Sequence, residues 1–363
     1  MKPAPSAYWR EIATGRRRDP IAFLLVAFLL PISLLYAMLL YLRSSLYRVG
    51  ILTSRKLPRP VISIGNITVG GTGKTPVTSY IATLLMNRGF KVAVLSRGYG
   101  GSLEGQTAVV ADGNSILVGA EQCGDEPYLL ASQLPGLIVV IGTDRYAAGL
   151  LAMKHFSPDI FLLDDGFQHL CLKRDMNILL LDACIPFGNH FTLPAGLLRE
   201  PVSAAGRADL IIHTRCPEGL GVQHPLPGKP NIAARHKIKH LVPFLGGTAT
   251  QLSELHGKKV MAFAAIAEPL SFFDGLRAQG IELAKCVAFP DHATYTPDKL
   301  AEIMAAVQSL AVDHVIITAK DAVKLKGLPA ELAKLIYVAC LELALDDAEI
   351  LDKQLINLLQ NQR

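Results

Sequence analysis

The sequence predicts an α/β protein in which an N-terminal membrane helix precedes a parallel-sheet domain and a second, smaller α/β domain. Residues 21–42 form an uncharged apolar segment, and two later regions alternate short β-branched segments with helical ones. Such alternation is typical of βαβ units, whose strands form a parallel sheet covered on both faces. Half of the 363 residues are hydrophobic and 18% are charged, which excludes a disordered chain. A single long apolar segment also excludes a polytopic transporter.

Residues 1–49 are predicted to anchor the protein in a membrane. As a helix, the 22 residues from Ile21 to Leu42 rise about 33 Å, and the hydrocarbon core of a bilayer is about 30 Å thick. Pro31 lies in the middle of this segment and predicts a kink. A helix that crosses the bilayer and a helix that lies in one leaflet both remain open. The alternative is a buried hairpin of core helices.

Basic residues flank the apolar segment and indicate a negatively charged partner. They are Arg16, Arg17, Arg18, Arg43, Arg48, Arg55 and Lys56. We interpret them as contacts for anionic lipid head groups. Each basic residue near the membrane surface contributes about 1 kcal/mol to membrane binding. A solvated flank is the simpler alternative.

Overall charge and cysteine content limit the classes of ligand that the chain binds. The net charge of +5 is too small and too dispersed for a nucleic-acid-binding protein. The six cysteines are scattered without CxxC pairs. They indicate reduced thiols of a cytoplasmic protein, and they exclude a disulfide scaffold and a zinc site.

Residues 50–216 are predicted to form the first α/β domain. Buried strands are expected at 61–64, 91–96, 137–142, 160–165, 177–182 and 210–213. Helices are expected between several of these strands, at 75–87, 127–133 and 145–155. Because strands and helices alternate, the strands should form one parallel sheet.

A linker and a second α/β domain are predicted to follow. Residues 217–257 begin with a stretch rich in proline and glycine, which is typical of a linker. The second domain is predicted over 258–363. Its expected strands are 260–265, 283–288, 314–318 and 335–339, and its expected helices are 271–278 and 297–310.

A phosphate-binding loop is predicted between strand 61–64 and helix 75–87. It reads Thr68, Val69, Gly70, Gly71, Thr72, Gly73, Lys74, Thr75. Glycines allow backbone N–H groups to turn inward around phosphate oxygens, and the helix N-terminus adds its positive end. Lys74 should reach the β- and γ-phosphates, and the Thr75 hydroxyl should bind Mg²⁺. Thr68 departs from the strict GxxxxGK[ST] pattern, but the strand–loop–helix context favours a P-loop NTPase-like domain over a glycine-rich turn with an unrelated lysine.

Acidic residues at the end of strand 160–165 predict a magnesium site. Asp164 and Asp165 terminate this strand, and in P-loop enzymes a strand-end aspartate holds Mg²⁺ directly or through water. Two other polar groups, GDEP at 124–127 and FPDH at 289–292, are less specific. An aspartate at a helix start is commonly a cap. A histidine beside an aspartate can support a general base.

At these residues the sequence resembles the tetraacyldisaccharide 4′-kinases, the lipid A 4′-kinases of Gram-negative bacteria. The resemblance covers nearly the whole chain, including the N-terminal apolar helix. Its segments are VGGTGKT at 69–75, RGYGG at 97–101, GDEP at 124–127, GTDR at 142–145, DDGFQH at 164–169, LPAGLLREP at 193–201, FPDH at 289–292 and TAKDAVKL at 318–325. Leu197 is a departure, because the family has proline there.

The resemblance implies transfer of the γ-phosphoryl group of ATP to the 4′-hydroxyl of tetraacyldisaccharide 1-phosphate, giving lipid IVA in lipopolysaccharide biosynthesis. It also implies a location at the inner membrane, with the catalytic body on the cytoplasmic face, and no obligate protein partner. Residues 68–75 would hold the nucleotide, and Thr75, Glu126, Asp164 and Asp165 would organise Mg²⁺. Asp125, assisted by His292, would accept the hydroxyl proton. Lys74, Arg97 and Arg145 would hold phosphate or stabilise the transferring group.

The main alternative is a membrane-tethered P-loop NTPase that switches or energises a partner protein. A guanine-nucleotide switch would carry an [NT]KxD motif, and the nearest text, 318–321, has the wrong spacing. The LSGGQ signature of transporter ATPases is absent. A non-catalytic membrane adaptor would leave Lys74, Thr75 and Asp164 without a role. ATP turnover that requires the lipid acceptor would distinguish the kinase from both.

Overall fold

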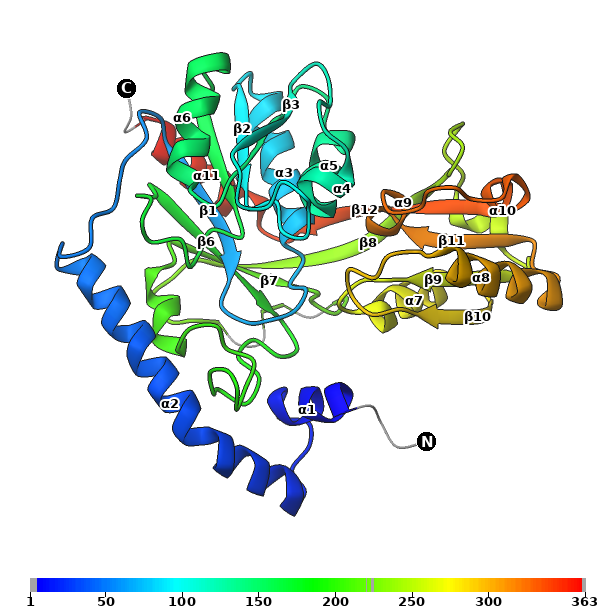
Figure 1. The fold of residues 1–363 in the computed structure, drawn as a ribbon, viewed down its shortest axis with the longest axis horizontal. Coiled ribbons are helices and arrows are strands. Elements are labelled where there is room, and N and C mark those ends of the chain that lie inside the picture. The colour runs from blue at the N-terminus through cyan, green and yellow to red at the C-terminus, as the bar shows by residue number, and fades with distance from the viewer. Residues whose placement is uncertain (1–4, 220, 223–224, 361–363) are drawn as a thin grey trace.

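The computed structural model describes residues 5–219, 221–222 and 225–360, and twelve strands of this part of the chain form one sheet. The strands are β1 (Val61–Asn66), β2 (Val92–Ser96), β3 (Ala108–Asp112), β4 (Ile138–Ile141), β5 (Ile160–Asp164), β6 (Met176–Asp182), β7 (Leu210–Thr214), β8 (Asn231–Pro243), β9 (Val260–Ala264), β10 (Leu283–Ala288), β11 (His314–Thr318) and β12 (Ile336–Leu345). Their order is β10-β9-β11-β12-β8-β7-β6-β1-β5-β2-β4-β3 (Figure 1).

Helices cover both faces of this sheet. They are α1 (Pro5–Ala13), α2 (Pro20–Arg48), α3 (Lys74–Asn87), α4 (Ala120–Cys123), α5 (Asp125–Gln133), α6 (Arg145–Phe156), α7 (Pro269–Ala278), α8 (Pro297–Leu310), α9 (Ala319–Ala322), α10 (Ala330–Leu335) and α11 (Ala348–Gln360). Two short 3₁₀ turns lie at Val202–Arg207 and Leu252–Leu255. Every strand predicted from the sequence is present, and all except β12 end within two residues of the predicted limits.

The larger half of the sheet is parallel from β7 to β4, as predicted. Side chains alternate between two faces of each strand. One face packs against α3, α5 and α11, and the other packs against α6. β3 was not predicted, and it pairs antiparallel at the edge. Because the strands from β7 to β4 are parallel, their carboxyl ends lie at one edge of the sheet. The loops after β1 and β5 lie together at this edge.

The predicted linker over 217–257 is wrong in its second half. β8 pairs parallel with β7 at its start and antiparallel with β12 along most of its length, which joins both halves into one sheet. Proline and glycine are concentrated before Asn231, so the linker composition ends where β8 begins. Basic residues are frequent in β8 and hide its β periodicity.

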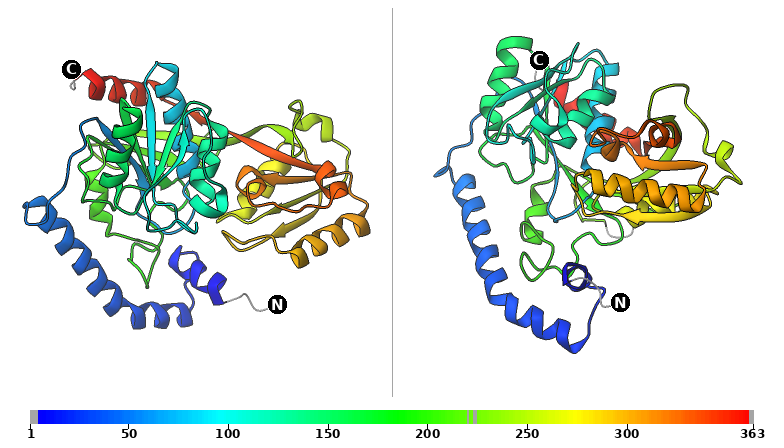
Figure 2. Two further views of the ribbon diagram at one scale, coloured as in Figure 1. Left: turned by 45° about the horizontal axis from the view of Figure 1, so that its top comes forward. Right: turned by 45° about the vertical axis from the view of Figure 1, so that its right-hand side comes forward.

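The predicted second domain over 258–363 also differs from the structure at its end. β12 extends to Leu345, and α11 then returns to the core of the first domain, where Leu351 and Leu355 are fully buried. Figure 2 shows α11 beside the first half of the sheet, away from α7 and α8. The last described helix therefore packs on the domain in which the P-loop lies.

α2 is the apolar helix expected near the amino terminus. Its most apolar 18-residue window has a mean hydropathy of 2.6 and is 6% buried, so a buried core hairpin is excluded for this described helix. Figure 2 shows α2 bent, which agrees with a proline inside a helix. Its length and composition are those of a membrane-associated helix.

Ser33 attaches this exposed helix to the body. Its hydroxyl donates to the Thr192 carbonyl at 2.7 Å, and the Thr192 hydroxyl donates to the Ser33 carbonyl at 2.8 Å. Both residues are buried. The loop that contains Thr192 also contacts the P-loop, because Val69 N–H donates to the Leu197 carbonyl at 2.8 Å. The membrane helix is therefore linked to the phosphate loop through one intervening segment.

We predict that Leu351→Ala lowers the free energy of unfolding by about 2–5 kcal/mol, because it leaves a cavity in the core of the parallel sheet. The exposed Ile356→Ala on the same helix is the matched control, and its effect should be small. Urea unfolding followed by circular dichroism measures both. Equal effects of the two substitutions would contradict the packing of α11 on this core.

Candidate active site

One cleft, with a volume of about 2010 Å³, connects the P-loop with the second domain and with α2. Its lining includes residues 70–75, Asp164 and Asp165 from the parallel half of the sheet. Asp291 and His292 line it from the second half, and Tyr36, Leu40 and Arg43 line it from α2. Ligands of open α/β sheets bind at the carboxyl ends of the strands, which is where this cleft lies.

The P-loop is in close contact with β8 and with the turn after β9. Gly73 has φ +74°, and an added Cβ would lie 2.7 Å from Cε1 of His236 on β8. At Gly71 an added Cβ would lie 2.9 Å from Cβ of Ala267, in the turn after β9. Glycine is therefore required at both positions. α3 begins at Lys74 without a side-chain cap, which leaves its first N–H groups available to an anion.

Thr68, the departure from the strict P-loop pattern, has a local explanation. It forms an antiparallel bridge with Leu198, and its carbonyl accepts a hydrogen bond from Asn66 Nδ2 at 2.9 Å. No positive φ is recorded there, in contrast to Gly70 at +107°. A threonine at the loop entry is therefore compatible with the glycine turn that follows.

The acidic pair Asp164 and Asp165 lies near the P-loop lysine. Lys74 Nζ is 3.7 Å from Asp165 Oδ1, and Arg199 Nη1 is 3.0 Å from Asp165 Oδ2. Asp164 is buried and accepts hydrogen bonds from the hydroxyls of Thr78 and Ser96. Arg199, which the sequence analysis did not single out, was contained in the quoted LPAGLLREP segment.

Burial and nearby negative charge dominate the electrostatics of Asp164. Burial, and after it the negative charges of Glu126 and Asp165, raise the pKa of Asp164 to about 7. Lys74 acts in the opposite direction. A divalent cation beside these carboxylates would stabilise their ionised forms, so the donor set fits Mg²⁺.

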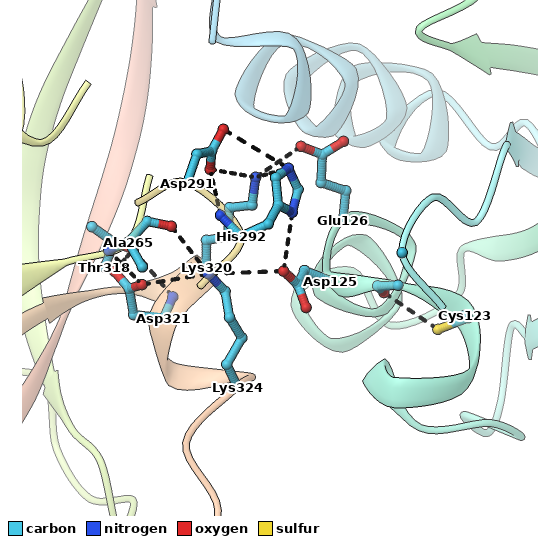
Figure 3. Close-up of polar contacts among 12 residues, drawn as sticks. Cys123, Asp125, Glu126, Ala265, Asp291, His292, Thr318, Lys320, Asp321 and Lys324 are labelled. Carbon is cyan, nitrogen blue, oxygen red and sulfur yellow. Dashed lines mark hydrogen bonds and ion pairs between the residues drawn. The ribbon is translucent and has the colours of Figure 1, made fainter. Parts of the chain in front are cut away.

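Asp125 and His292 come from different halves of the molecule and contact each other (Figure 3), and His292 lines the cleft. Asp125 is the first residue of α5, and its Oδ2 is 3.4 Å from His292 Nδ1, which lies in the loop after β10. Burial would raise the pKa of Asp125, but the hydrogen bond from His292 and the charges of Lys324 and Lys320 outweigh burial and lower it. The Asp125 carboxylate is therefore ionised at neutral pH.

Two lysines of the TAKDAVKL segment complete this cluster, and the sequence analysis had given them no role. Lys320 Nζ is 3.1 Å from Glu126 Oε1 and 3.3 Å from His292 Nε2. Lys324 Nζ is 3.8 Å from Asp125 Oδ2 and donates to the Ala265 carbonyl at 3.1 Å. The sequence did contain a signal for these residues, because two lysines four positions apart follow a buried strand directly and can lie on one face of a helix.

The two predicted arginines differ in position. Arg145 is buried and its Nη1 donates to the Thr143 carbonyl at 3.3 Å, while Asp164 and Asp165 act electrostatically on it. Burial lowers the pKa of Arg145, and the two acids oppose that change. Arg97 is exposed and pairs with Glu104 at 3.4 Å, although it lines the same cleft. The described residues thus place Arg145, but not Arg97, against the acidic pair.

Among the described residues, no three aspartate, glutamate, histidine or cysteine side chains converge to form a metal-binding group. Mg²⁺ is commonly held by one or two carboxylates together with substrate phosphates and water. The pattern of this cleft is therefore that of a shared nucleotide–metal site and not of a preformed metal cage.

Comparisons with known proteins agree on one family. The family model described as tetraacyldisaccharide-1-P 4′-kinase matches residues 25–360. A tetraacyldisaccharide 4′-kinase of Pelobacter propionicus is 54% identical, with 99% of this chain and 100% of that protein covered. A tetraacyldisaccharide 4′-kinase of Geobacter metallireducens is 49% identical, with 91% and 97% covered. The crystal structure of LpxK from Aquifex aeolicus in complex with ATP has a TM-score of 0.77 and 35% identity, with 92% and 99% covered.

We predict that His236, which packs on Gly73, makes stability depend on pH. Burial and, secondarily, the charge of Arg215 lower the pKa of His236 to about 4, whereas the unfolded value is about 6.5. The unfolded chain therefore takes up a proton first, and the free energy of unfolding falls as pH falls from about 6.5 to 4. The loss should be about 1.4 kcal/mol per unit of pKa difference.

Urea unfolding at pH 7 and pH 5 measures this effect. His236→Asn should lose less stability between the two pH values than the native chain, and the exposed His155→Asn is the control. An unchanged pH dependence in His236→Asn would contradict the assignment of this histidine as buried and neutral.

Proposed function

The chain belongs to the tetraacyldisaccharide-1-P 4′-kinase family, and on this premise we propose how its residues carry out the reaction. The protein is an ATP-dependent kinase that phosphorylates the 4′-hydroxyl of the lipid A precursor tetraacyldisaccharide 1-phosphate. The alternative of a tethered NTPase is not favoured. The observation that carries the assignment of roles is the cleft that joins Lys74 to α2 and to His292, which contacts Asp125.

The phosphate loop is proposed to bind the triphosphate of ATP. Residues 68–75 would surround the phosphates, with backbone N–H groups of 70–75 and the uncapped start of α3 as donors, since the Val69 N–H already donates to the Leu197 carbonyl. Lys74 would exchange its contact with Asp165 for the β- and γ-phosphates. Arg145 is buried beside the acidic pair and would neutralise charge on the transferring group, and Arg97 would approach it only after a change of its exposed side chain.

Magnesium is the proposed metal, and Thr75, Glu126, Asp164 and Asp165 are the residues that would hold it together with phosphate. When bound, Mg²⁺ neutralises charge on the β- and γ-phosphates. Lys320 neutralises Glu126 in this structure, at 3.1 Å, so that carboxylate would have to exchange its partner on loading. The proposal is supported by the contact of Asp165 with Lys74 and by the hydrogen bond from Thr78 of α3 to Asp164, the last residue of β5.

Asp125 is proposed as the base for the acceptor hydroxyl. The 4′-oxygen attacks the γ-phosphorus, its proton passes to the Asp125 carboxylate, and the bond to the leaving ADP oxygen breaks. His292 Nδ1 contacts Asp125 Oδ2 and would orient the carboxylate. Phosphoryl transfer requires little covalent chemistry from the protein. Positioning of the reactants and neutralisation of charge therefore dominate catalysis.

The membrane helix is proposed to bring the enzyme to its lipid substrate at the cytoplasmic face of the bacterial inner membrane. Tyr36, Leu40 and Arg43 of α2 line the cleft that contains the P-loop. An acyl chain could therefore remain beside α2 while the sugar reaches the cleft. Anchoring at the bilayer raises the effective concentration of a lipid acceptor. Basic residues near α2, including Arg43 and Arg55, would meet anionic head groups or the 1-phosphate.

We predict that label from [γ-³²P]ATP appears in the glycolipid when purified protein is incubated with tetraacyldisaccharide 1-phosphate in detergent micelles. Asp125→Asn should lower this rate roughly 10²–10⁴-fold, because a general base is lost, with little change in the KM for ATP. His292→Ala should also lower it, and Asp298→Asn, at an exposed acid, is the control. Equal ATP hydrolysis without glycolipid would favour the NTPase, and an unchanged rate in His292→Ala would remove its orienting role.

We predict that Asp164→Asn raises the Mg²⁺ concentration needed for half-maximal activity at least about tenfold, because a carboxylate that fits the metal is removed. Calorimetric titration of the protein–ATP complex with Mg²⁺ provides a readout separate from turnover. Asp298→Asn is again the matched control. An unchanged Mg²⁺ requirement would contradict the metal role of Asp164.

A further inference from the structure

Helix α1 lies outside the region that the family model matches, which begins at residue 25. It nevertheless packs on the body of the enzyme. Ile12 and Ala13 are buried, and Asn189 N–H donates to the Ala13 carbonyl at 3.0 Å. Trp9 Nε1 donates to the Pro194 carbonyl at 2.9 Å. α1 is thus attached to the 187–198 loop, whose Leu197 carbonyl accepts the Val69 N–H of the P-loop.

Arg10 extends from α1 to the second half of the molecule. Its Nη1 donates to the Ala267 carbonyl at 3.0 Å, and its Nη2 forms an ion pair with Glu268, the N-cap residue of α7. A planar guanidinium donates to a carbonyl and a carboxylate at once, which a lysine ammonium does with less geometric definition. Arg10 therefore holds the turn between β9 and α7.

This turn is in direct contact with the P-loop. Ala267 Cβ lies where a side chain at Gly71 would have to be, and Arg10 Nη2 is 3.9 Å from the Cβ position at Gly70. Arg10 is not among the residues that line the cleft, so it acts on the P-loop from outside. Figure 1 shows α1 on the side of the second half of the sheet opposite α9, the helix that carries Lys320.

The connection between α1 and α2 is itself held by polar contacts. Arg17 pairs with Asp19 at 2.5 Å and with Glu11 at 2.9 Å, and its guanidinium lies 4.3 Å from the centroid of the Tyr8 ring. Asp19 caps α2, whose first turns expose Phe23. The position of α1 is therefore linked to the helix that faces the bilayer.

We propose that Arg10 is a positioning residue for phosphoryl transfer, which keeps the 266–268 turn of the second half against the P-loop. The inference rests on the proposed function, because that half supplies His292. α1 attaches to the P-loop side through the 187–198 loop, and Arg10 attaches it to the turn after β9. ATP binding and the approach of His292 to Asp125 then depend on a contact made by a helix next to the membrane segment.

The test compares Arg10→Ala, Arg10→Glu, Glu268→Arg and the double charge exchange Arg10→Glu with Glu268→Arg, all in the full chain. Each single variant should lower kcat/KM for ATP about tenfold, since small displacements of catalytic groups have effects of this size or larger. The exchange should recover part of that loss, because it restores the ion pair but not the hydrogen bond to the Ala267 carbonyl. Arg59→Ala, at an exposed arginine before β1, is the control. Because both partners are partly exposed, the thermal unfolding midpoint should stay unchanged.

Trp9, the only tryptophan in the sequence, gives a readout separate from turnover. Saturating ATP should reduce acrylamide quenching of Trp9 in the native chain and not in Arg10→Ala. Wild-type kcat/KM in Arg10→Ala, no ATP effect on Trp9 in the native chain, or a loss that the exchange does not recover would each overturn the proposal. Activity retained in Asp125→Asn would instead contradict the proposed base, and it would leave the ATP-dependent readouts of Arg10 unaffected.

Discussion

The close packing of the glycine loop against β8 and the turn after β9 is the constraint on which the active site depends. Gly73 lies on His236 and Gly71 on Ala267, at distances that exclude a Cβ atom. The phosphate loop of one half of the sheet is therefore in direct contact with the other half. β8 makes this possible because it pairs with β7 at one end and with β12 along its length.

Charge is distributed across the same boundary. The first half supplies the carboxylates Asp125, Glu126 and Asp164, and the second half supplies His292, Lys320 and Lys324. Each set alone would carry uncompensated charge in a partly buried cleft, which is costly. Their pairing lowers that cost and brings Asp125, Glu126 and His292, the residues to which we propose catalytic and metal-binding roles, into one cluster (Figure 3). Binding of a triphosphate and a divalent ion would exchange several of these partners.

Much of the fold was predictable from local pattern. Strands β1, β2, β5 and β6 are continuous apolar segments, because both faces of a parallel sheet are covered. β8 was missed because its charged residues obscure the alternation and its start follows a proline-rich stretch. α11 was missed because nothing local in 348–360 indicates that it packs on a core formed mainly by residues more than 100 positions away. The positions of β8 and α11 depend on packing against residues that are distant in the sequence.

The sequence by itself determined the phosphate loop, the strand-end acids, the apolar helix and the family resemblance, because each depends on residues adjacent in the chain. Only the tertiary structure decided that Arg199 pairs with Asp165, that Lys324 contacts Asp125 and that Arg10 reaches Glu268. It also left Arg97 apart from the acidic pair. Those contacts join residues separated by long stretches of chain, so their distances are set by how the sheet and its loops pack and not by spacing along the sequence.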